Sequence, residues 1–251
     1  MIQRILKEVA AEKKVFFTGA AIICIFQAAT IIIQLRLHLY RGCILDAFAW
    51  SSTYFPLCVY PAAMCIMIAM TKDFLHPDRV LRNRTFHLLW VEVWIKSGII
   101  SFFLAAAAMA ETLIFGRTLG KEFSVWDRTD SYCYYAIGKT MEHVDIAKIL
   151  LAAFLLLFTG IWLTSVIPLL VKWFFHHYFA GILISILINL GGLTLRTAYT
   201  SARNLFYGNI YQGIDMRYIF IYPGILLLLF LIAGCFLQKR DFLEKQKEGT
   251  V

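Results

Sequence analysis

The run GRTLGKE at residues 116–122 comes closer to a phosphate-binding loop than any other segment of this sequence. Such a loop needs four residues between its two glycines, and a Ser or Thr after its lysine to hold magnesium. This run has three residues between Gly116 and Gly120, and Glu122 follows Lys121. We therefore expect that the chain does not hydrolyse ATP by itself.

Metal-ligating and catalytic patterns are also missing. His176 and His177 are adjacent, so on a helix their side chains would point about 100° apart and share one metal poorly. The sequence has no Gly-x-Ser-x-Gly elbow, no His-Glu-x-x-His pair and no Glu-Glu dyad. We expect no catalytic, cofactor-binding or metal-binding residue on this chain.

A few charged residues lie inside apolar stretches, where a charge is costly in lipid. Glu111 is the one acid deep in such a stretch. It either lines a water path or faces the outer interface near a helix end, and the sequence leaves both interpretations open. Glu92 and Lys96 are four residues apart and predict a local ion pair on one helix.

The elements that carry these residues must be membrane helices. The chain has 251 residues, of which 60% are hydrophobic and 16% charged, and its mean hydropathy is +0.71. A soluble domain carries roughly a quarter charged residues. The apolar residues form blocks close to the ~20 residues that cross a hydrocarbon core of about 30 Å, without the alternation of a β-barrel. We predict an all-α, polytopic membrane protein with one transmembrane domain over residues 1–251. Its six predicted spans are about 15–35, 51–70, 93–115, 149–171, 173–195 and 218–237.

The distribution of Lys and Arg predicts that both termini are cytoplasmic. With that orientation, 13 basic residues lie in the cytoplasmic segments, and 10 lie in the longer outer segments 36–50, 116–148 and 196–217. The net charge of +8 needs no nucleic-acid partner, because cytoplasmic loops beside anionic lipid explain it. The predicted location is a plasma membrane.

The N-terminal segment and the cysteines each leave two interpretations. Residues 1–14 place Ile2, Ile5, Leu6 and Val9 on one helical face, which favours an amphipathic helix on the inner leaflet over a frayed extension of the first span. We expect that span to be retained, since it is too long for a signal peptide and lacks a cleavage site. Cys43 and Cys133 fall in predicted outer loops, where free thiols are favoured over a disulfide.

Two connections have unusual compositions. The predicted cytoplasmic loop 71–92 contains Arg79, Arg82 and Arg84, which either anchor it to anionic lipid or form a short helix presented to a partner protein. The predicted outer segment 196–217 is too polar to span, yet Tyr199, Phe206, Tyr207 and Tyr211 punctuate it. We expect a re-entrant or interfacial element there.

Small residues and prolines predict how the spans pack and bend. Ser97, Ser101 and Ala105 are spaced by four and form a stripe that lets another helix approach closely. Asn189, Gly191 and Gly192 mark a place where the fifth span can bend or open. Kinks are expected at the prolines within the spans: Pro56, Pro61 and Pro168.

The layout resembles the permease subunits of type V (ABC2-type) ABC exporters. The shared features are an amphipathic first helix, six spans with both ends inside, a basic loop between spans two and three, and a non-spanning element before span six. The last span stops at Lys239-Arg240-Asp241, which is similar to the C-terminus of these permeases. The resemblance in layout covers essentially the whole chain, while this local motif is short and weakly specific.

The resemblance implies a homodimer of permeases, or a pseudo-dimer with a second permease, and a separate cytoplasmic ABC ATPase that binds ATP and Mg²⁺. It also implies that a coupling helix at about 72–86 docks on the ATPase and that segment 196–217 caps the outer end of the pathway. The implied ATPase-coupling residues are Asp78, Arg79, Val80, Leu81, Arg82 and Arg84. The candidate pathway or gate residues are Glu111, Asn189, Gly191, Gly192, Tyr199, Phe206 and Tyr207.

By the same resemblance, we expect a bacterial exporter of hydrophobic or amphipathic peptides, like the exporters of lantibiotics and phenol-soluble modulins. Two other classes remain open. A membrane-embedded enzyme would need polar residues clustered at one depth, whereas Gln27, Gln34, Asn189 and Glu111 are scattered. A non-transporting immunity or sensor protein would lack an ATPase partner.

Overall fold

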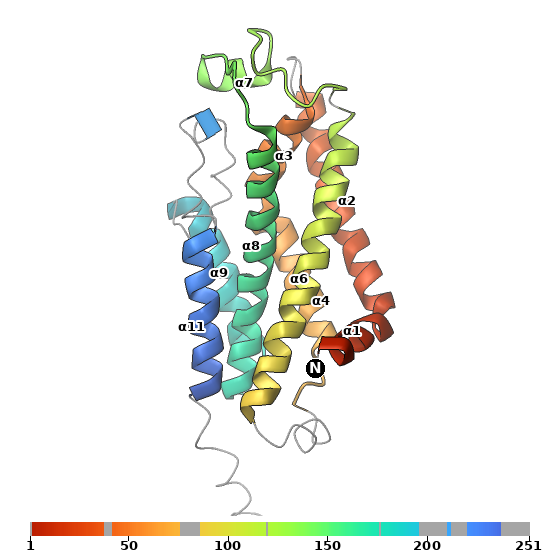
Figure 1. Ribbon diagram of the computed structural model, residues 1–251, viewed down its shortest axis with the longest axis vertical. Helices are drawn as coiled ribbons and strands as arrows, with labels where there is room; N and C mark the ends of the chain where they lie inside the picture. The colour runs from red at the N-terminus through yellow and green to blue at the C-terminus, as the bar shows by residue number, and fades with distance from the viewer. Residues whose placement is uncertain are drawn as a thin grey trace, which may run out of the picture.

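The chain forms a bundle of helices in a computed structural model (Figure 1). The residues that it describes are 2–37, 42–75, 86–118, 120–175, 177–195, 210–211 and 220–236. Within them there are helices and no strands, so the all-α class is confirmed. The elements are α1 (Ile2–Ala11), α2 (Lys13–Leu37), α3 (Ile44–Tyr54), the π-helical turn η1 (Phe55–Val59), α4 (Tyr60–Met70), α6 (Phe86–Gly116), α7 (Tyr132–Ile137), α8 (Ile146–Phe175), α9 (Phe179–Leu195) and α11 (Tyr222–Phe236).

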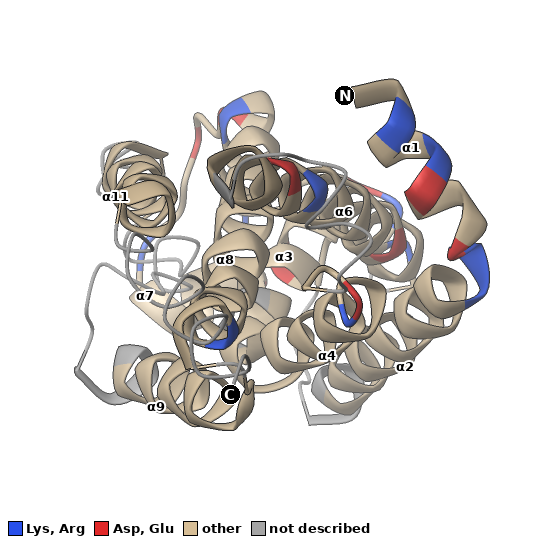
Figure 2. Ribbon diagram, turned by 90° about the horizontal axis from the view of Figure 1, so that it is seen from below, with Lys and Arg blue, Asp and Glu red and all other residues tan. Residues whose placement is uncertain are grey.

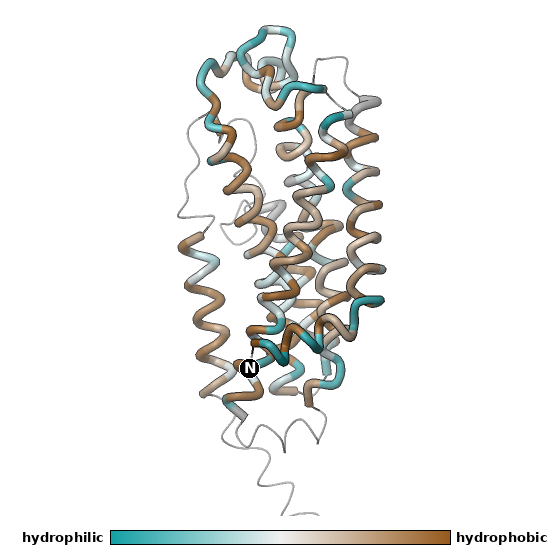
Figure 3. The backbone as a smooth tube through the Cα atoms, turned by 45° about the vertical axis from the view of Figure 1, so that its right-hand side comes forward, coloured by the Kyte–Doolittle hydropathy of each residue, from teal (hydrophilic) through white to brown (hydrophobic). Residues whose placement is uncertain are grey.

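Three of these helices, α2, α6 and α8, are long and apolar enough to cross a membrane. A fourth candidate consists of Ile44–Ser51 and Phe55–Met70, which are bent by 57° at the break between them; Pro56 lies in the π-helical turn that follows. Helices α9 and α11 are apolar but have 17 and 15 residues, fewer than the ~20 that cross a bilayer core. Hydrophobic residues follow the lengths of the helices, and hydrophilic ones gather at the two ends (Figure 3).

Two helices begin earlier than the hydropathy blocks predict. Helix α3 begins at Ile44 rather than near 51, and α6 begins at Phe86 rather than near 93. An acid lies in each of the added stretches, Asp46 in α3 and Glu92 in α6. The structure gives both acids hydrogen-bond partners, so the helix continues through them. Helix α8 likewise extends to Phe175, and α9 begins at Phe179 rather than near 173.

Helix α8 lies at the centre of the bundle and packs on α4, α6, α9 and α11. It is the most buried of the three long helices, at 61% of its most apolar stretch against 39% for α6 and 28% for α2. The predicted small-residue stripe is fully buried where α8 crosses α6. There Trp162 of α8 donates its indole N–H to the Ser97 hydroxyl at 2.9 Å, and its ring fills the space beside Gly98.

The bundle has two chemically different ends (Figure 1). We call one the α1 end: α1 lies crosswise there, α4 and α8 end there, α6 begins there, and α11 ends there at Phe236. We call the other the α7 end, because the segment around α7 covers it. Seen from the α1 end, charged residues follow α1 beside α6, while the ribbons of the other helices are mostly uncharged (Figure 2).

The buried acid Asp46, at the start of α3, helps to hold the α7 end, beside backbone hydrogen bonds from Ile44 and Leu45 to the Glu122 and Phe123 carbonyls. One of its carboxyl oxygens accepts the Trp126 indole N–H at 2.8 Å, and the other accepts the Cys43 backbone N–H at 2.7 Å. Cys43 and Cys133 are both buried free thiols, so the alternative of a disulfide is not realised in this structure. Burial, helped by the charge of Asp46, raises the pKa of Cys133 to about 12.

Candidate functional site

The residues that the resemblance assigns to ATPase coupling, Asp78, Arg79, Val80, Leu81, Arg82 and Arg84, lie outside the described residues. The structure does describe the chain on both sides of them, as the turn Thr71–Leu75 after α4 and the first turns of α6 from Phe86. We call these two flanks, together with the side chains that bind them, the base of segment 76–85. Along the chain, these flanks join that segment to α4 and α6.

The first flank is bound by Lys172, near the end of α8. The Lys172 ammonium donates to the Lys72 backbone carbonyl at 2.7 Å and to the Tyr178 hydroxyl at 2.9 Å, and the Tyr178 hydroxyl donates to the Thr71 carbonyl at 3.4 Å. These carbonyls follow the C-terminus of α4, where backbone acceptors lack helical partners and a cation is favourable. Burial raises the pKa of Tyr178 to about 12, so its phenol keeps the proton that it donates.

Aromatic rings join the first flank to the second. Trp173 of α8 stacks on Phe74 of the first flank, with ring centroids 6.0 Å apart, and contacts the tilted ring of Trp90 of α6 at 5.4 Å. Trp173 also donates its indole N–H to the Gly234 carbonyl of α11 at 3.1 Å. A side chain at Gly234 would collide with the Trp90 ring, so the glycine is needed for this close approach. The three rings therefore connect α4, α6, α8 and α11.

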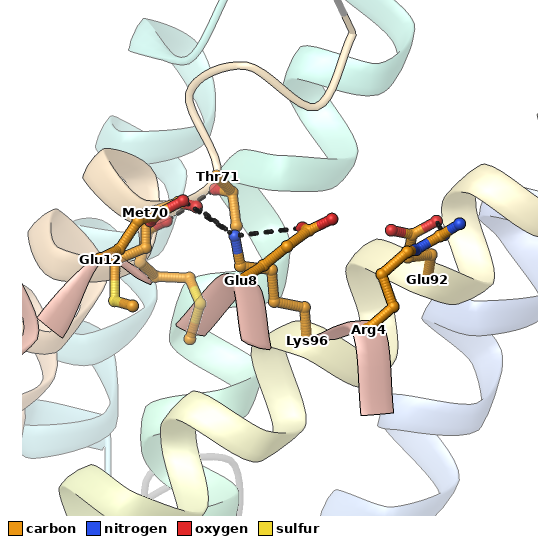
Figure 4. A network of polar contacts seen from close by, with 8 residues as sticks. Arg4, Glu8, Glu12, Met70, Thr71, Glu92 and Lys96 are labelled. Carbon is orange, nitrogen blue, oxygen red and sulfur yellow. Dashed lines mark hydrogen bonds and ion pairs between the residues drawn. The ribbon is translucent and has the colours of Figure 1, made fainter. Parts of the chain in front are cut away.

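The second flank is bound to α1 by charges (Figure 4). Arg4 of α1 forms an ion pair and a hydrogen bond with Glu92 of α6. Lys96 of α6 is only 3% exposed and lies 3.3 Å from Glu12 and 3.9 Å from Glu8, both at α1. The sequence predicts a local Glu92–Lys96 pair; in the structure each of these two side chains binds a residue of the N-terminal segment.

Lys96 also reaches the first flank, because its ammonium donates to the Met70 carbonyl at the end of α4 at 2.7 Å (Figure 4). One cation thus holds the end of α4, the start of α6 and helix α1 together. A buried ammonium is tolerated only where carboxylates and carbonyls replace water around it, and this arrangement supplies both. The base is therefore a single polar and aromatic network with contacts to α1, α4, α6, α8 and α11.

Sequence reasoning missed Lys96, Lys172 and Tyr178 as members of this network. One signal was available for the α1 part of it: Arg4, Glu8 and Glu12 recur every four residues and so form one charged face of the first helix. That face turns toward α6, whereas Ile2 and Leu6 are 58% and 43% exposed. Their exposure suits the predicted helix at the lipid interface.

Among the described candidate pathway residues, Glu111 lies apart from the group on α9. Glu111 is buried against α2, and Asn189 of α9 is buried beside Thr164 of α8 at 3.5 Å, so the two lie in different helix seams. Gly191 and Gly192 lie within α9, four and three residues before its end. Tyr199, Phe206 and Tyr207 lie outside the described residues.

Comparisons with known proteins give no relative from which a function could be carried over. No protein-family model matches the chain. No curated protein and no solved structure matches it either. The functional argument therefore depends on the helices, on the base and on the resemblance in layout.

Proposed function

We propose that this chain is the membrane subunit of a bacterial ATP-driven exporter, with six spans and both termini in the cytoplasm. The observation that carries the proposal is the base, where the two flanks of segment 76–85 are bound to each other and to three other helices, α1, α8 and α11. A chain that only anchored its basic residues to lipid would need no such network beneath them. The resemblance to type V ABC exporter permeases in layout supports the same function.

In the proposed mechanism, a cytoplasmic ATPase binds ATP and Mg²⁺ and docks on the segment at about 72–86. Movement of that segment would act on α4 through Thr71 and Met70 and on α6 through Trp90 and Lys96. Through Trp173 and Lys172 it would also act on α8, the central helix. ATP binding by the partner can shift the bundle between two states only if the docked complex favours one of them, and the base would transmit that preference.

The proposed assembly is a dimer of permeases, either two copies of this chain or one copy with a second permease. Helices α2 and α9, the first and fifth of the proposed spans, have large exposed apolar side chains that lipid or the second subunit would cover. These include Phe17 and Ile25 of α2 and Phe179 and Leu187 of α9, each at least 65% exposed. The proposed substrate is a hydrophobic or amphipathic peptide.

Affinity purification of the full chain from its host in mild detergent tests the proposal, with ATPase activity as the readout. The triple variant Arg79→Ala/Arg82→Ala/Arg84→Ala should insert normally and lose the ATPase subunit. Removing a docked charge costs about 2–5 kcal/mol of complex stability. A lipid anchor contributes only about 1 kcal/mol per residue and would leave the complex intact.

A matched control is Lys121→Ala/Lys139→Ala/Lys148→Ala, which removes three exposed cations at the α7 end and should keep the ATPase. Normal ATPase association in the arginine variant would assign these arginines to lipid anchoring. A wild-type preparation that contains no ATPase subunit would favour the other two classes, a membrane-embedded enzyme or a non-transporting immunity or sensor protein.

A further inference from the structure

Helices α2 and α6 enclose a polar site that the proposed export mechanism does not use. It consists of Gln27 of α2 with Glu111 and Thr112 of α6, which are 2%, 5% and 0% exposed. The thiol of Cys24 and the backbone of Ala28, on the same turn of α2 as Gln27, lie against the Glu111 carboxyl. Three polar side chains buried at one place in an apolar seam need mutual hydrogen bonds.

The hydrogen bonds of Thr112 fix the orientation of the Gln27 amide. The Thr112 hydroxyl donates its one proton to the Ala108 carbonyl at 2.8 Å, so it can only accept a further hydrogen bond. The group of Gln27 that faces it at 3.3 Å must therefore be the donating NH₂. The carbonyl oxygen of the Gln27 amide therefore faces away from Thr112. The opposite orientation of the amide would place this oxygen against the Thr112 hydroxyl oxygen, and both are acceptors.

The site consequently has more acceptors than donors. In the part of the chain that the structure describes, the two oxygens of Glu111 and the amide oxygen of Gln27 make no hydrogen bond of normal geometry, and the donors nearest Glu111 are the Cys24 thiol and the Ala28 backbone N–H. The thiol is a weak donor, the Ala28 N–H already belongs to helix α2, and no charged side chain among the described residues lies against Glu111. An ionised Glu111 would therefore place a negative charge in a buried site that offers no cation and only weak or shared donors, which is strongly unfavourable.

We propose that Glu111 is a proton-binding site in the seam between α2 and α6. Binding one proton turns a carboxyl oxygen from an acceptor into a donor, which is the group that the site lacks. The ionised carboxylate instead needs water or other donors around it, so release of the proton requires the seam to open. The closed seam is thus the proton-loaded state, and the site links a proton to separation of α2 from α6. This inference does not depend on an ATPase partner.

The test uses the full chain purified into lipid nanodiscs and the apolar reagent dicyclohexylcarbodiimide. The reagent takes the proton of a neutral carboxyl onto one nitrogen while the carboxyl oxygen adds to its central carbon, and the O-acylisourea rearranges to a stable N-acylurea. Peptide mass spectrometry should find this adduct on Glu111. The Glu111→Gln variant should lose the adduct, while Glu92→Gln should keep it, because Glu92 is an ionised partner of Arg4.

Infrared spectroscopy of the unlabelled protein gives a second readout that does not depend on reactivity. The carbonyl stretch of a neutral carboxylic acid should be present in the wild type and lost in Glu111→Gln. Mapping of the adduct in the wild type keeps the test valid if that variant does not fold. Absence of the adduct on Glu111 would overturn the proposal, as would equal labelling by a water-soluble carbodiimide. If Na⁺ or an organic amine protected Glu111 from the reagent, the ligand of the site would be that cation and the proton proposal would be overturned.

Discussion

The α1 end and the α7 end of the bundle both bury charge, but they use it differently. At the α7 end, Asp46 binds the backbone of its own helix start and one indole, so the acid fixes the segment that covers this end. At the α1 end, Lys96 and Lys172 bind carbonyls and carboxylates of other helices, up to 100 residues away in sequence. The first arrangement holds a cover in place, and the second joins helices to one another.

This difference indicates where movement of the bundle would start. The cover at the α7 end is bound mainly to α3, through Asp46 and through backbone hydrogen bonds from Ile44 and Leu45. The base of segment 76–85 joins more helices, because its cations contact α1, α4, α6 and α8 at once. A partner that pulls on the α1 end would therefore act on the whole bundle, whereas a ligand on the α7 end would act on one segment.

The largest expected effect comes from Lys96→Ala, which tests whether the α1 end is one network. The change leaves the Glu8 and Glu12 carboxylates and the Met70 carbonyl without their common donor. Removing one member of a buried ion pair costs about 3–5 kcal/mol, and the partial exposure of the two acids places this variant near the lower value. The measurement is the free energy of unfolding in mixed micelles with increasing SDS.

The matched control is Lys148→Ala, an exposed lysine at the α7 end, which should change that free energy by less than about 0.5 kcal/mol. In the proposed complex with an ATPase, Lys96→Ala should also weaken the stimulation of the ATPase by substrate. A Lys96→Ala protein as stable as the wild type would show that the buried ammonium adds nothing net to the base.

A somewhat smaller effect is expected for Asp46→Ala, which tests whether the α7 end is a separate cover. The Trp126 indole and the Cys43 amide would lose their charged acceptor, which costs about 2–3 kcal/mol. Cys43 and Cys133 should become accessible to maleimides, since both are buried under this segment. Asp46→Asn keeps one acceptor oxygen and should be less affected. If Asp46→Ala impaired ATPase association as much as Lys96→Ala, the two ends would not be independent.

The apolar pattern of the sequence predicted the class of the protein and the positions of most helices. Long runs of Leu, Ile and Phe fall within α2, α6, α8 and α11. A helix that contacts lipid on one side and the bundle interior on the other is apolar all round, so such runs indicate where it lies. The pattern failed at the starts of α3 and α6. There Asp46 and Glu92 interrupt the hydropathy, and their partners Trp126 and Arg4 are about 80 or more residues away.

The candidate site was less predictable than the fold. The basic loop was visible in the sequence, but the residues that anchor its flanks were not, because Lys172 and Tyr178 bind backbone carbonyls that have no sequence signature. The Glu92–Lys96 prediction used spacing on one helix and ignored the charged face of α1. Spacing finds partners on the same helix, whereas this network depends on which helices become neighbours.

A third prediction tests the part of the base that does not involve α1. Lys172→Met keeps the length and apolar stem of the side chain but removes the donor to the Lys72 carbonyl and the Tyr178 hydroxyl. It also removes the cation 4.2 Å from the centre of the Tyr178 ring. The expected loss is about 1–2 kcal/mol, because the site is partly open to water. A double-mutant cycle of Lys172→Met with Lys96→Ala should show coupling, since the two lysines bind neighbouring carbonyls; additive effects would divide the base into two sites.

The smallest expected effect distinguishes the two ends by pH. Burial and the charge of Asp46 raise the pKa of Cys133 from an ordinary 9.0 to about 12, and burial raises that of Tyr178 from 10.0 to about 12. Below pH 9 the thiol is neutral in the folded and unfolded chains and adds no pH dependence. Above pH 9 the unfolded thiol ionises while the folded thiol stays neutral, so stability falls as pH rises toward 12.

Between pH 9 and 10, before tyrosine titrates in the unfolded chain, the loss due to Cys133 should be under about 1 kcal/mol per pH unit. Cys133→Ser should remove that part of the slope, and Tyr178→Phe should change the slope only above pH 10. A slope between pH 9 and 10 that is the same in Cys133→Ser and the wild type would mean that this thiol is open to water, and that the α7 end is not the closed cover described here.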